Sequence, residues 1–390
     1  MSYRYLVLGA GMQGVAAAYD LATHGDADSV ILGDNNPDAA KAGANRINSL
    51  LKQDIVKPST VDAADSEGLV RLLTNFDGLL SAVPYKFNLD LTKIAILTRT
   101  NMVDMGGHTG VVRKQLEMKS DVRQAGISII PDCGMGPGMN ITLALYAISL
   151  LDKTDELKIY DGGLPQDPKP PWNYNLFFHI NGLINEYDGE AYYLREGKVT
   201  QVPALTECEE IEIPPLGRLE AFVTSGGLST MPWTFEKELK TLENKTLRYS
   251  GHCQIFQSYK RLGLFREDPI EINDQKIVPR EFLFRLLEPQ LYHPEAKDIC
   301  IIHIRANGTR QGKPARATIH LVDRFDDKTK FRAMEKLTGW HAAIVLELAV
   351  KGEINKGVIP IEKALSGERF VELMPKRGWK IEELVEFQPL

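Results

Sequence analysis

Short apolar runs alternate with helix-like stretches through the first 150 residues of the chain. The runs lie at residues 5–8, 29–32, 77–83, 101–103 and 127–130. Each has the length of a buried strand, and the stretches between them have helical spacing of their apolar residues. Strands separated by helices are typical of a parallel sheet covered on both faces. The pattern therefore predicts a doubly covered parallel sheet in this part of the chain.

The pattern changes after residue 150. Glycines and prolines crowd residues 161–172, which predicts a loop rather than the interior of an element. Alternating runs follow at residues 219–223, 301–305 and 315–322, and the last two are separated by Asn307-Gly308 and Gly312, which predicts an antiparallel hairpin. Residues 338–350 return to a helical pattern, and we expect this helix to pack back on the parallel sheet.

These patterns predict an α/β protein of two domains. The first is a Rossmann-type parallel sheet domain formed by residues 1–135 and completed by the C-terminal helices of residues 336–390. Residues 136–335 are expected to form a mixed α/β domain for substrate contacts and oligomerisation. At 390 residues, the chain exceeds what one hydrophobic core usually serves.

Composition and charge narrow the possible partners. The formal net charge is −6, which argues against nucleic acid or an anionic membrane as a partner because both need a basic surface. No apolar run has the length of a membrane span, and the N-terminus runs directly into a predicted strand, so we expect no signal peptide. The four cysteines are scattered, which predicts neither disulfides nor a metal site and favours a cytoplasmic location.

A glycine turn follows the first predicted strand. It reads Gly9-Ala10-Gly11-Met12-Gln13-Gly14, it opens a helix, and Asp34 stands 20 residues later at the end of the second strand. The first glycine suits a tight turn, the second lets a pyrophosphate approach, and the third lets helix and strand pack closely. Asp34 suits the ribose hydroxyls and would repel a 2′-phosphate. The sequence therefore predicts NAD as the cofactor.

Two later segments are expected at the same edge of the sheet, where the cofactor's nicotinamide half would lie. They end the strands at residues 77–83 and 101–103. Ordinary strand-end turns are the alternative for either segment taken alone. The predicted cofactor contacts there are Ser81, Ala82, Val83, Pro84, Val103 and Gly107.

The glycine turn, Ala82-Val83-Pro84-Tyr85 and residues 103–107 resemble the saccharopine dehydrogenase superfamily. So do residues 134–140 and Gly162-Gly163-Leu164-Pro165. Within this superfamily, residues 220–230 and 247–253 are most similar to the L-lysine 6-dehydrogenases. The resemblance implies NAD-dependent oxidative deamination at the ε-carbon of L-lysine, giving 2-aminoadipate 6-semialdehyde, which cyclises to 1-piperideine-6-carboxylate. It also implies a homodimer or a higher homo-oligomer.

The sequence departs from saccharopine-binding members in one loop. Residues 224–229 contain no arginine, whereas the extra carboxylates of saccharopine would call for one. A smaller substrate is the simpler interpretation. A reductase that joins an aldehyde to an amine, as in saccharopine or carboxynorspermidine formation, is the alternative enzyme, and a non-catalytic NAD-binding protein is the alternative outside enzymes.

Amine oxidation requires a group that takes the ammonium proton. The candidates are Asp104, His108 and His252, and the alternatives are a solvated strand-end carboxylate, a loop histidine and a helix cap. Arg248 is the candidate for the substrate α-carboxylate, against a surface ion pair as its alternative. Further polar residues are expected to line the substrate site, although each also suits a loop hydrogen bond: Tyr174, Asn175, Thr224 and Ser225.

Overall fold

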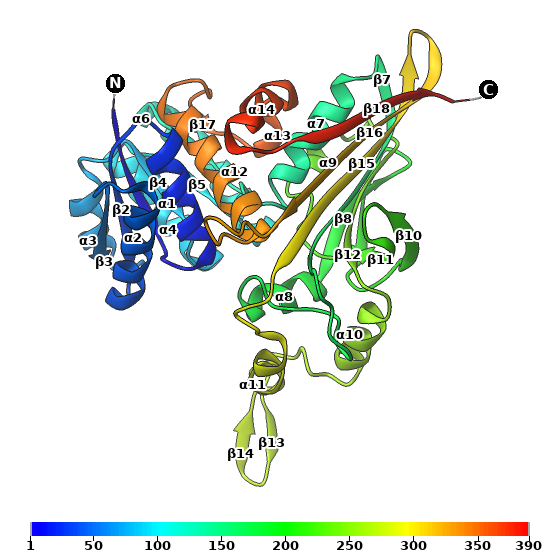
Figure 1. Cartoon of the computed structure of the whole chain (residues 1–390), viewed down its shortest axis with the longest axis horizontal. Coiled ribbons are helices and arrows are strands. Elements are labelled where there is room, and N and C mark those ends of the chain that lie inside the picture. The colour runs from blue at the N-terminus through cyan, green and yellow to red at the C-terminus, as the bar shows by residue number, and fades with distance from the viewer. Residues whose placement is uncertain (1, 389–390) are drawn as a thin grey trace.

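The computed structural model describes residues 2–388, which form two sheet-based domains side by side (Figure 1). One domain contains a seven-stranded sheet and the other a nine-stranded sheet. Among the described residues, no helix is both long and apolar enough to cross a membrane. The predicted α/β class is confirmed.

The seven-stranded sheet is parallel throughout, as its residue pairings show. Buried apolar residues fill its central strands, which is expected when both faces are covered. In spatial order the strands are β17 (Gly357–Val358), β6 (Ser128–Ile130), β5 (Asn101–Asp104), β4 (Gly78–Ser81), β1 (Tyr3–Leu8), β2 (Ala27–Asp34) and β3 (Val56–Thr60).

Helices cover both faces of this sheet. One face packs against α1 (Met12–His24), α2 (Pro37–Leu51) and α12 (Ala333–Val350). A Cβ on Gly339 of α12 would lie 2.6 Å from the carbonyl oxygen of Gln13, so these two helices touch backbone to backbone. The predicted return of the late helix is thus confirmed. The remaining helices of the domain are η1 (Tyr85–Phe87), α3 (Ser66–Leu73), α4 (Asn88–Thr98), α5 (Thr109–Glu117) and α6 (Lys119–Ala125).

The nine-stranded sheet is mixed. Its path runs β10-β11-β12-β7-β15-β16-β18, and β8 joins β12 and β9 at the side. β7 pairs in parallel with β12, and the other pairs are antiparallel. The strands are β7 (Lys153–Pro165), β8 (Glu190–Arg195), β9 (Lys198–Pro203), β10 (Glu209–Ile213), β11 (Gly217–Val223), β12 (Thr241–Arg248), β15 (Asp298–Arg310), β16 (Lys313–Arg324) and β18 (Ile381–Phe387).

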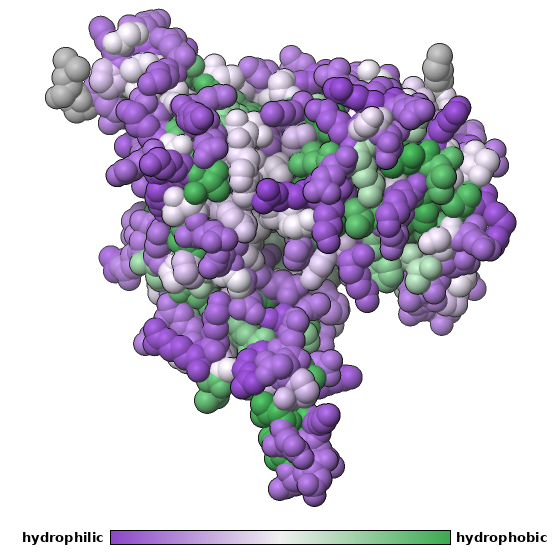
Figure 2. Space-filling model, turned by 180° about the vertical axis from the view of Figure 1, so that it is seen from behind, coloured by the Kyte–Doolittle hydropathy of each residue, from purple (hydrophilic) through white to green (hydrophobic). Residues whose placement is uncertain are grey.

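Short helices and one small hairpin complete the chain. A protruding arm, formed by β13, β14 and α11, extends from the lower edge of the molecule in Figure 1, and Figure 2 shows apolar atoms on it. The remaining elements are α7 (Met139–Ser149), α8 (Ile180–Tyr187), α9 (Met231–Thr234), α10 (His252–Arg261), β13 (Ile270–Ile272), β14 (Gln275–Ile277), α11 (Pro279–Leu291), α13 (Ile361–Ala364), α14 (Gly367–Leu373) and η2 (Met374–Arg377).

Two expectations about the second domain differ from the structure. Residues 161–165, predicted as part of a loop, form the end of strand β7. Their glycines are required by close packing, because a Cβ on Gly162 would lie 2.6 Å from the carbonyl oxygen of Leu247. The expected first domain included all of residues 336–390, whereas β18 pairs with β16 in the second sheet.

The predicted antiparallel hairpin is present. β15 and β16 pair over their whole length and turn at Gln311-Gly312, both in the left-handed region with φ of 52° and 71°. Asn307-Gly308 lies inside β15, where the pairing with β7 shifts register. β18 covers the outer edge of β16, so the edge that faces solvent belongs to the C-terminal strand.

Candidate active site

The three glycines of the turn have three different surroundings. Gly9 has φ of 108°, and a Cβ there would lie 2.6 Å from the carbonyl oxygen of Ala82. A Cβ on Gly14 would lie 1.9 Å from the carbonyl oxygen of Gly9, whereas a Cβ on Gly11 would meet no atom within 4 Å. Two glycines are therefore required by the protein itself, and Gly11 alone borders open space.

The start of helix α1 fits an anionic group. Within residues 2–388, the backbone N–H groups of Met12 and Gln13 have no acceptor, because they belong to the first helical turn. Such N–H groups, together with the helix dipole, bind phosphates. Asp34 holds the turn from the other side: its carboxylate accepts hydrogen bonds from the N–H of Ala10 at 2.7 Å and of Asn36 at 2.8 Å. The residues present therefore fit a dinucleotide.

The other predicted cofactor residues lie at the carboxyl ends of β4 and β5. Ser81 is buried and its hydroxyl hydrogen-bonds to Asn88 at 2.8 Å. Ala82 contacts Gly9, Val83 and Pro84 follow β4, Val103 is buried in β5, and Gly107 lies against the ring of Tyr85. Gln13 links the domains, because its side-chain amide donates to the carbonyl oxygen of Phe177 at 3.1 Å.

Asp104 is engaged on both carboxylate oxygens inside the first domain. It accepts hydrogen bonds from the backbone N–H of Gly106 at 2.9 Å and of Asp132 at 3.1 Å, and from the side chain of Gln115 at 2.9 Å. Burial raises the pKa of this carboxyl above its usual value. Asp104 is 1% exposed, so this placement favours a role in holding the strand-end loops together.

His108 lies on the surface at the start of α5. Its Nδ1 accepts a hydrogen bond from the N–H of Val111 at 3.3 Å, and its ring stacks on Tyr85 at 5.0 Å between centroids. The hydrogen bond caps the start of α5, and the stacking packs His108 against Tyr85, which follows β4. The structure thus places His108 beside the predicted cofactor residues, with one ring nitrogen already occupied.

His252 belongs to a buried hydrogen-bond chain that ends at Arg248. Its Nδ1 lies 3.3 Å from the carbonyl oxygen of Trp172, and its Nε2 lies 2.9 Å from the hydroxyl of Tyr187. The tautomer that satisfies both contacts has its proton on Nδ1. Tyr187 then donates to His252 and accepts from Nε of Arg248 at 2.9 Å. Burial and the charge of Arg248 lower the pKa of His252 to about 3, so the imidazole is neutral.

Arg248 is a buried cation of the second domain. It ends β12, is 3% exposed, and lies over the ring of Tyr174 at 4.9 Å. Its Nη1 donates to the hydroxyl of Thr246 and to the carbonyl oxygen of Leu247, both at 2.9 Å. Nη2 has a carboxylate oxygen of Glu186 at 3.7 Å. Nε and Nη1 of the guanidinium thus donate hydrogen bonds to protein acceptors, and Nη2 faces the half-buried carboxylate of Glu186.

Two acidic side chains close to Arg248 were missed by the sequence analysis. Glu186 lies near the end of α8, and burial raises the pKa of its carboxyl to about 7 against the opposing charge of Arg248. Asp161 lies in β7, and burial raises its pKa to about 6, although hydrogen bonds and Arg248 act the other way. Raised carboxyl pKa values in a site with a buried cation are typical of functional residues.

The remaining predicted liners divide into two groups. Tyr174 contacts Arg248 through its ring. Asn175 is used structurally, because it donates to the carbonyl oxygen of Leu176 at 3.0 Å and accepts from the N–H of His293 at 2.9 Å. Ser225 donates to the carbonyl oxygen of Asn185 at 2.7 Å, and Thr224 is buried beside it. Ser225 thus holds the end of α8, and Thr224 precedes it in the same loop.

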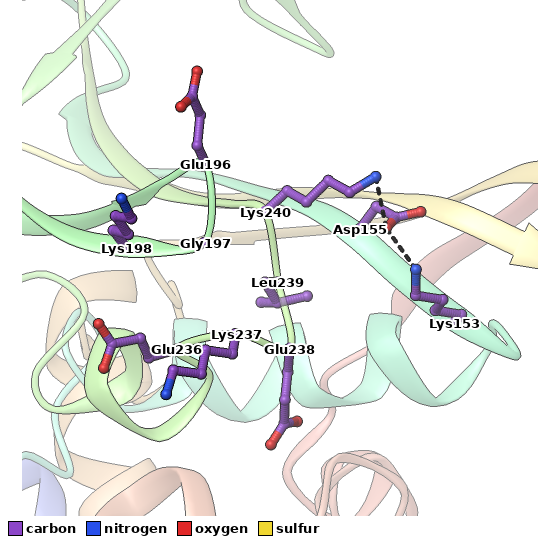
Figure 3. Close-up of a pocket in the computed structure, with 10 residues that line it drawn as sticks. All are labelled: Lys153, Asp155, Glu196, Gly197, Lys198, Glu236, Lys237, Glu238, Leu239 and Lys240. Atoms are coloured by element: carbon purple, nitrogen blue, oxygen red, sulfur yellow. Dashed lines mark hydrogen bonds and ion pairs between the residues drawn. The ribbon is translucent and has the colours of Figure 1, made fainter.

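A separate charged hollow of about 600 Å³ lies on the second domain (Figure 3). In it, Lys153 and Lys240 both approach Asp155, at 2.9 and 3.3 Å. The lining residues come from the start of β7, the turn between β8 and β9, and the segment before β12. None of the predicted site residues lines this hollow, so it is distinct from the site around Arg248.

The fold and the glycine turn at the start of α1 define the class of protein, an NAD(P)-dependent oxidoreductase with a second sheet-based domain. Residues 5–130 match the saccharopine dehydrogenase NADP binding domain, and residues 134–379 match the saccharopine dehydrogenase C-terminal domain. The chain therefore belongs to the saccharopine dehydrogenase family.

Several curated relatives share about a quarter of their residues with the chain. Saccharopine dehydrogenase [NADP(+), L-glutamate-forming] of Saccharomyces cerevisiae is 24% identical over 299 residues, which cover 74% of this chain and 64% of the yeast protein. Carboxynorspermidine synthase of Vibrio alginolyticus is 25% identical over 99% of this chain and 98% of its own length. Mouse mitochondrial alpha-aminoadipic semialdehyde synthase is 26% identical, and the chain spans 42% of it.

A solved structure of the yeast saccharopine dehydrogenase has the same fold. The apo, histidine-tagged L-Glu-forming enzyme superposes with a TM-score of 0.78 at 19% identity, covering 98% of this chain and all of that one. Both domains of the present chain therefore have counterparts in that structure. The superposition supports the fold assignment, while the substrate has to be inferred from the side chains.

Proposed function

We propose that this chain is an NAD-dependent L-lysine 6-dehydrogenase. The observation that carries the proposal is the charge pattern beside the cofactor site: one buried guanidinium, Arg248, with two carboxylates, Asp161 and Glu186. Lysine has the complementary pattern, one carboxylate and two ammonium groups. Saccharopine has three carboxylates, which would face two acidic side chains and a single cation.

The proposed reaction converts L-lysine, NAD⁺ and water into 2-aminoadipate 6-semialdehyde, NADH, ammonium and a proton. The bound nicotinamide supplies the hydride acceptor. In this proposal Arg248 binds the substrate α-carboxylate through Nη2, because Nε and Nη1 already donate to protein acceptors and a carboxylate complements the positive charge. Glu186, 3.7 Å from that atom, is then placed beside the α-ammonium group.

The choice of NAD over NADP is part of the proposal and depends on Asp34. Its carboxylate ends β2 and is fixed by two backbone N–H groups. A 2′-phosphate would approach this negative charge, whereas the ribose hydroxyls of NAD would donate hydrogen bonds to it. The matching domain is named for NADP binding, so a direct comparison of the two cofactors is needed.

The assay follows NADH absorbance with the purified chain, L-lysine and NAD. L-Ornithine and 2-aminohexanoate serve as controls of chain length and of the missing ε-nitrogen. We expect turnover with lysine, little with ornithine and none with 2-aminohexanoate. Absence of lysine turnover with both NAD and NADP would contradict the proposal.

The alternative is a reductase that joins an aldehyde to an amine. Its support is the match to carboxynorspermidine synthase over 99% of the chain, since a product with one carboxylate and several amines also suits Arg248 and two carboxylates. NADPH or NADH consumption with an amino-acid semialdehyde plus a diamine, combined with no oxidation of lysine, would favour this reductase.

A further inference from the structure

A buried carboxylate, Asp161, lies on the inner face of the second sheet. Asp161 of β7 is in register with Thr246 on β12 and Ile302 on β15. Its neighbours on the β15 side are fully buried apolar residues, among them Ile302 and Ile304. Asp161 itself is 6% exposed. Burying a carboxylate costs free energy, so a buried carboxylate is usually paired with a donor or a cation, or serves a function.

The carboxylate of Asp161 reaches the cofactor edge of the first sheet. Gly136 lies in the segment that follows β6, and a Cβ on it would be 2.7 Å from Oδ2 of Asp161. The carboxylate therefore occupies the space that a side chain at position 136 would fill. In sheets of this type the reactive part of the cofactor lies beyond the carboxyl ends of the strands. The carboxylate of Asp161 thus lies between the second sheet and the place where we expect the reactive part of the cofactor.

Asn140, at the start of α7, fixes the orientation of Asp161. Its Oδ1 accepts hydrogen bonds from the N–H of Gly138 at 3.1 Å and of Ile141 at 2.8 Å. These two contacts determine which side of the amide carries the protons. Its Nδ2 must therefore donate, to Oδ2 of Asp161 at 2.8 Å and to the carbonyl oxygen of Gly227 at 3.0 Å. One oxygen of Asp161 is held by this donor.

The separation of Asp161 and Arg248 suits the length of lysine. Arg248 stands two residues beyond Thr246, the partner of Asp161 on the adjacent strand. A strand spacing of ~4.8 Å and a rise of ~3.3 Å per residue place the two Cα atoms about 8 Å apart. Six single bonds of ~1.5 Å separate the carboxyl carbon of lysine from its ε-nitrogen, which spans about 7 Å when extended.

We infer that Asp161 accepts the proton of the substrate ammonium group whose carbon is oxidised. The inference rests on the proposed function and names the base for that reaction. An N–H bond of the ε-ammonium breaks, its electron pair stays on nitrogen, and the proton moves to the Asp161 carboxylate. A C–H bond at the ε-carbon then breaks, its electron pair leaves as hydride for the nicotinamide of the proposed NAD cofactor, and the nitrogen lone pair forms the C=N bond of an iminium. Water adds to that carbon, and ammonium leaves as the aldehyde forms.

The charges around Asp161 suit this role. Arg248 on β12 and Glu186 on α8 are the charged groups that act on it, and Asn244 on β12 and Asn140 on α7 are its neutral donors. Because burial raises the pKa of Asp161 to about 6, the carboxylate is ionised near neutral pH and still accepts a proton readily. His252, by contrast, is held neutral with both ring nitrogens occupied.

The test compares Asp161→Asn with Asp155→Asn, which changes a carboxylate on the same strand that pairs with Lys153 and Lys240. We expect Asp161→Asn to lower kcat for lysine at least ~100-fold, the usual contribution of a general base. Asp155→Asn should behave as the wild type. Gly136→Ala is the second variant, because its methyl group would displace the carboxylate while keeping it in the chain, and it should also lower kcat.

A binding measurement separates this role from a merely structural one. Calorimetry with the NADH-saturated enzyme gives the Kd of L-lysine and of 2-aminohexanoate, which lacks the ε-nitrogen. We expect the wild type to prefer lysine, and Asp161→Asn to lose that preference while binding 2-aminohexanoate unchanged.

If the wild type turns over lysine and Asp161→Asn keeps full activity, the inference is overturned and the proposed function stands. Loss of 2-aminohexanoate binding in both Asp161→Asn and Gly136→Ala would also overturn the inference, because it would show that these substitutions disrupt the whole substrate site. A wild type that does not turn over lysine would overturn the proposed function. In that case, equal affinities for the two ligands in the wild type would overturn the inference as well.

Discussion

Replacing Gly11 by alanine should separate cofactor binding from folding. Gly11 has φ of −73° and ψ of −177°, a conformation that alanine adopts freely, and its added methyl group meets no atom within 4 Å. Restricting the unfolded chain would stabilise the fold by about 0.4–1 kcal/mol. Glycine is a better N-cap than alanine, by up to ~1 kcal/mol. These two effects offset each other, so the free energy of unfolding should change by less than ~1 kcal/mol.

Cofactor affinity should nevertheless fall. The methyl group would project into the open space beside the free N–H groups of Met12 and Gln13, where the pyrophosphate is expected. Loss of close approach should weaken NAD binding at least tenfold, or about 1.4 kcal/mol. Thermal unfolding without cofactor and calorimetric titration with NAD measure the two quantities. Unchanged NAD affinity in a stable Gly11→Ala protein would refute the placement of the pyrophosphate.

Four further outcomes follow from the same geometry. Gly14→Ala should destabilise the protein by about 1–3 kcal/mol in thermal unfolding, because its Cβ would lie 1.9 Å from a backbone oxygen; an unchanged midpoint would contradict this. Asp34→Arg should shift the kcat/KM ratio toward NADP, and an unaltered ratio would remove Asp34 from ribose recognition. Arg248→Lys should raise the KM for lysine far more than that for NAD, since one ammonium cannot replace the contacts of Nε and Nη1 and also reach the substrate carboxylate; the opposite order would move Arg248 out of the substrate site. Because burial raises the folded-state pKa of Glu186 to about 7, wild-type stability should fall relative to Glu186→Gln as pH rises from about 4.5 to 7, and parallel pH curves of unfolding would contradict that pKa shift.

The glycine turn was predictable because its function depends on local spacing. Gly14 is required by a contact with Gly9 of the same turn, whereas Gly9 is required by Ala82, which follows the distant strand β4. The spacing of the glycines between a strand and a helix nevertheless identified the turn. Arg248 was a candidate carboxylate-binding residue through its residue type, whereas its burial was not predicted. Its partner Tyr187 lies 61 residues away, so no local pattern indicated their contact.

Asp161 was hidden by a misinterpretation of glycine. Gly162 and Gly163 suggested a loop, whereas they sit in a buried strand. A Cβ on Gly163 would lie 2.5 Å from the Cε atom of Met334, a residue far along the chain. Glycine marks both turns and close approaches, and only the tertiary structure distinguishes them. The acidic residue beside them was therefore assigned to a loop and not considered as a base.

The neutral state of His252 has a consequence for the whole site. A protonated His252 could not accept from Tyr187, and it would add a second positive charge beside Arg248. Keeping it neutral leaves Arg248 as a single cation facing the carboxylates of Glu186 and Asp161. When both carboxyls are ionised, that set has one negative charge in excess, and lysine, with one positive charge in excess, would neutralise it. In the proposed function, the hydrogen-bond chain therefore contributes to substrate selection by holding the charge balance of the site, without taking part in proton transfer.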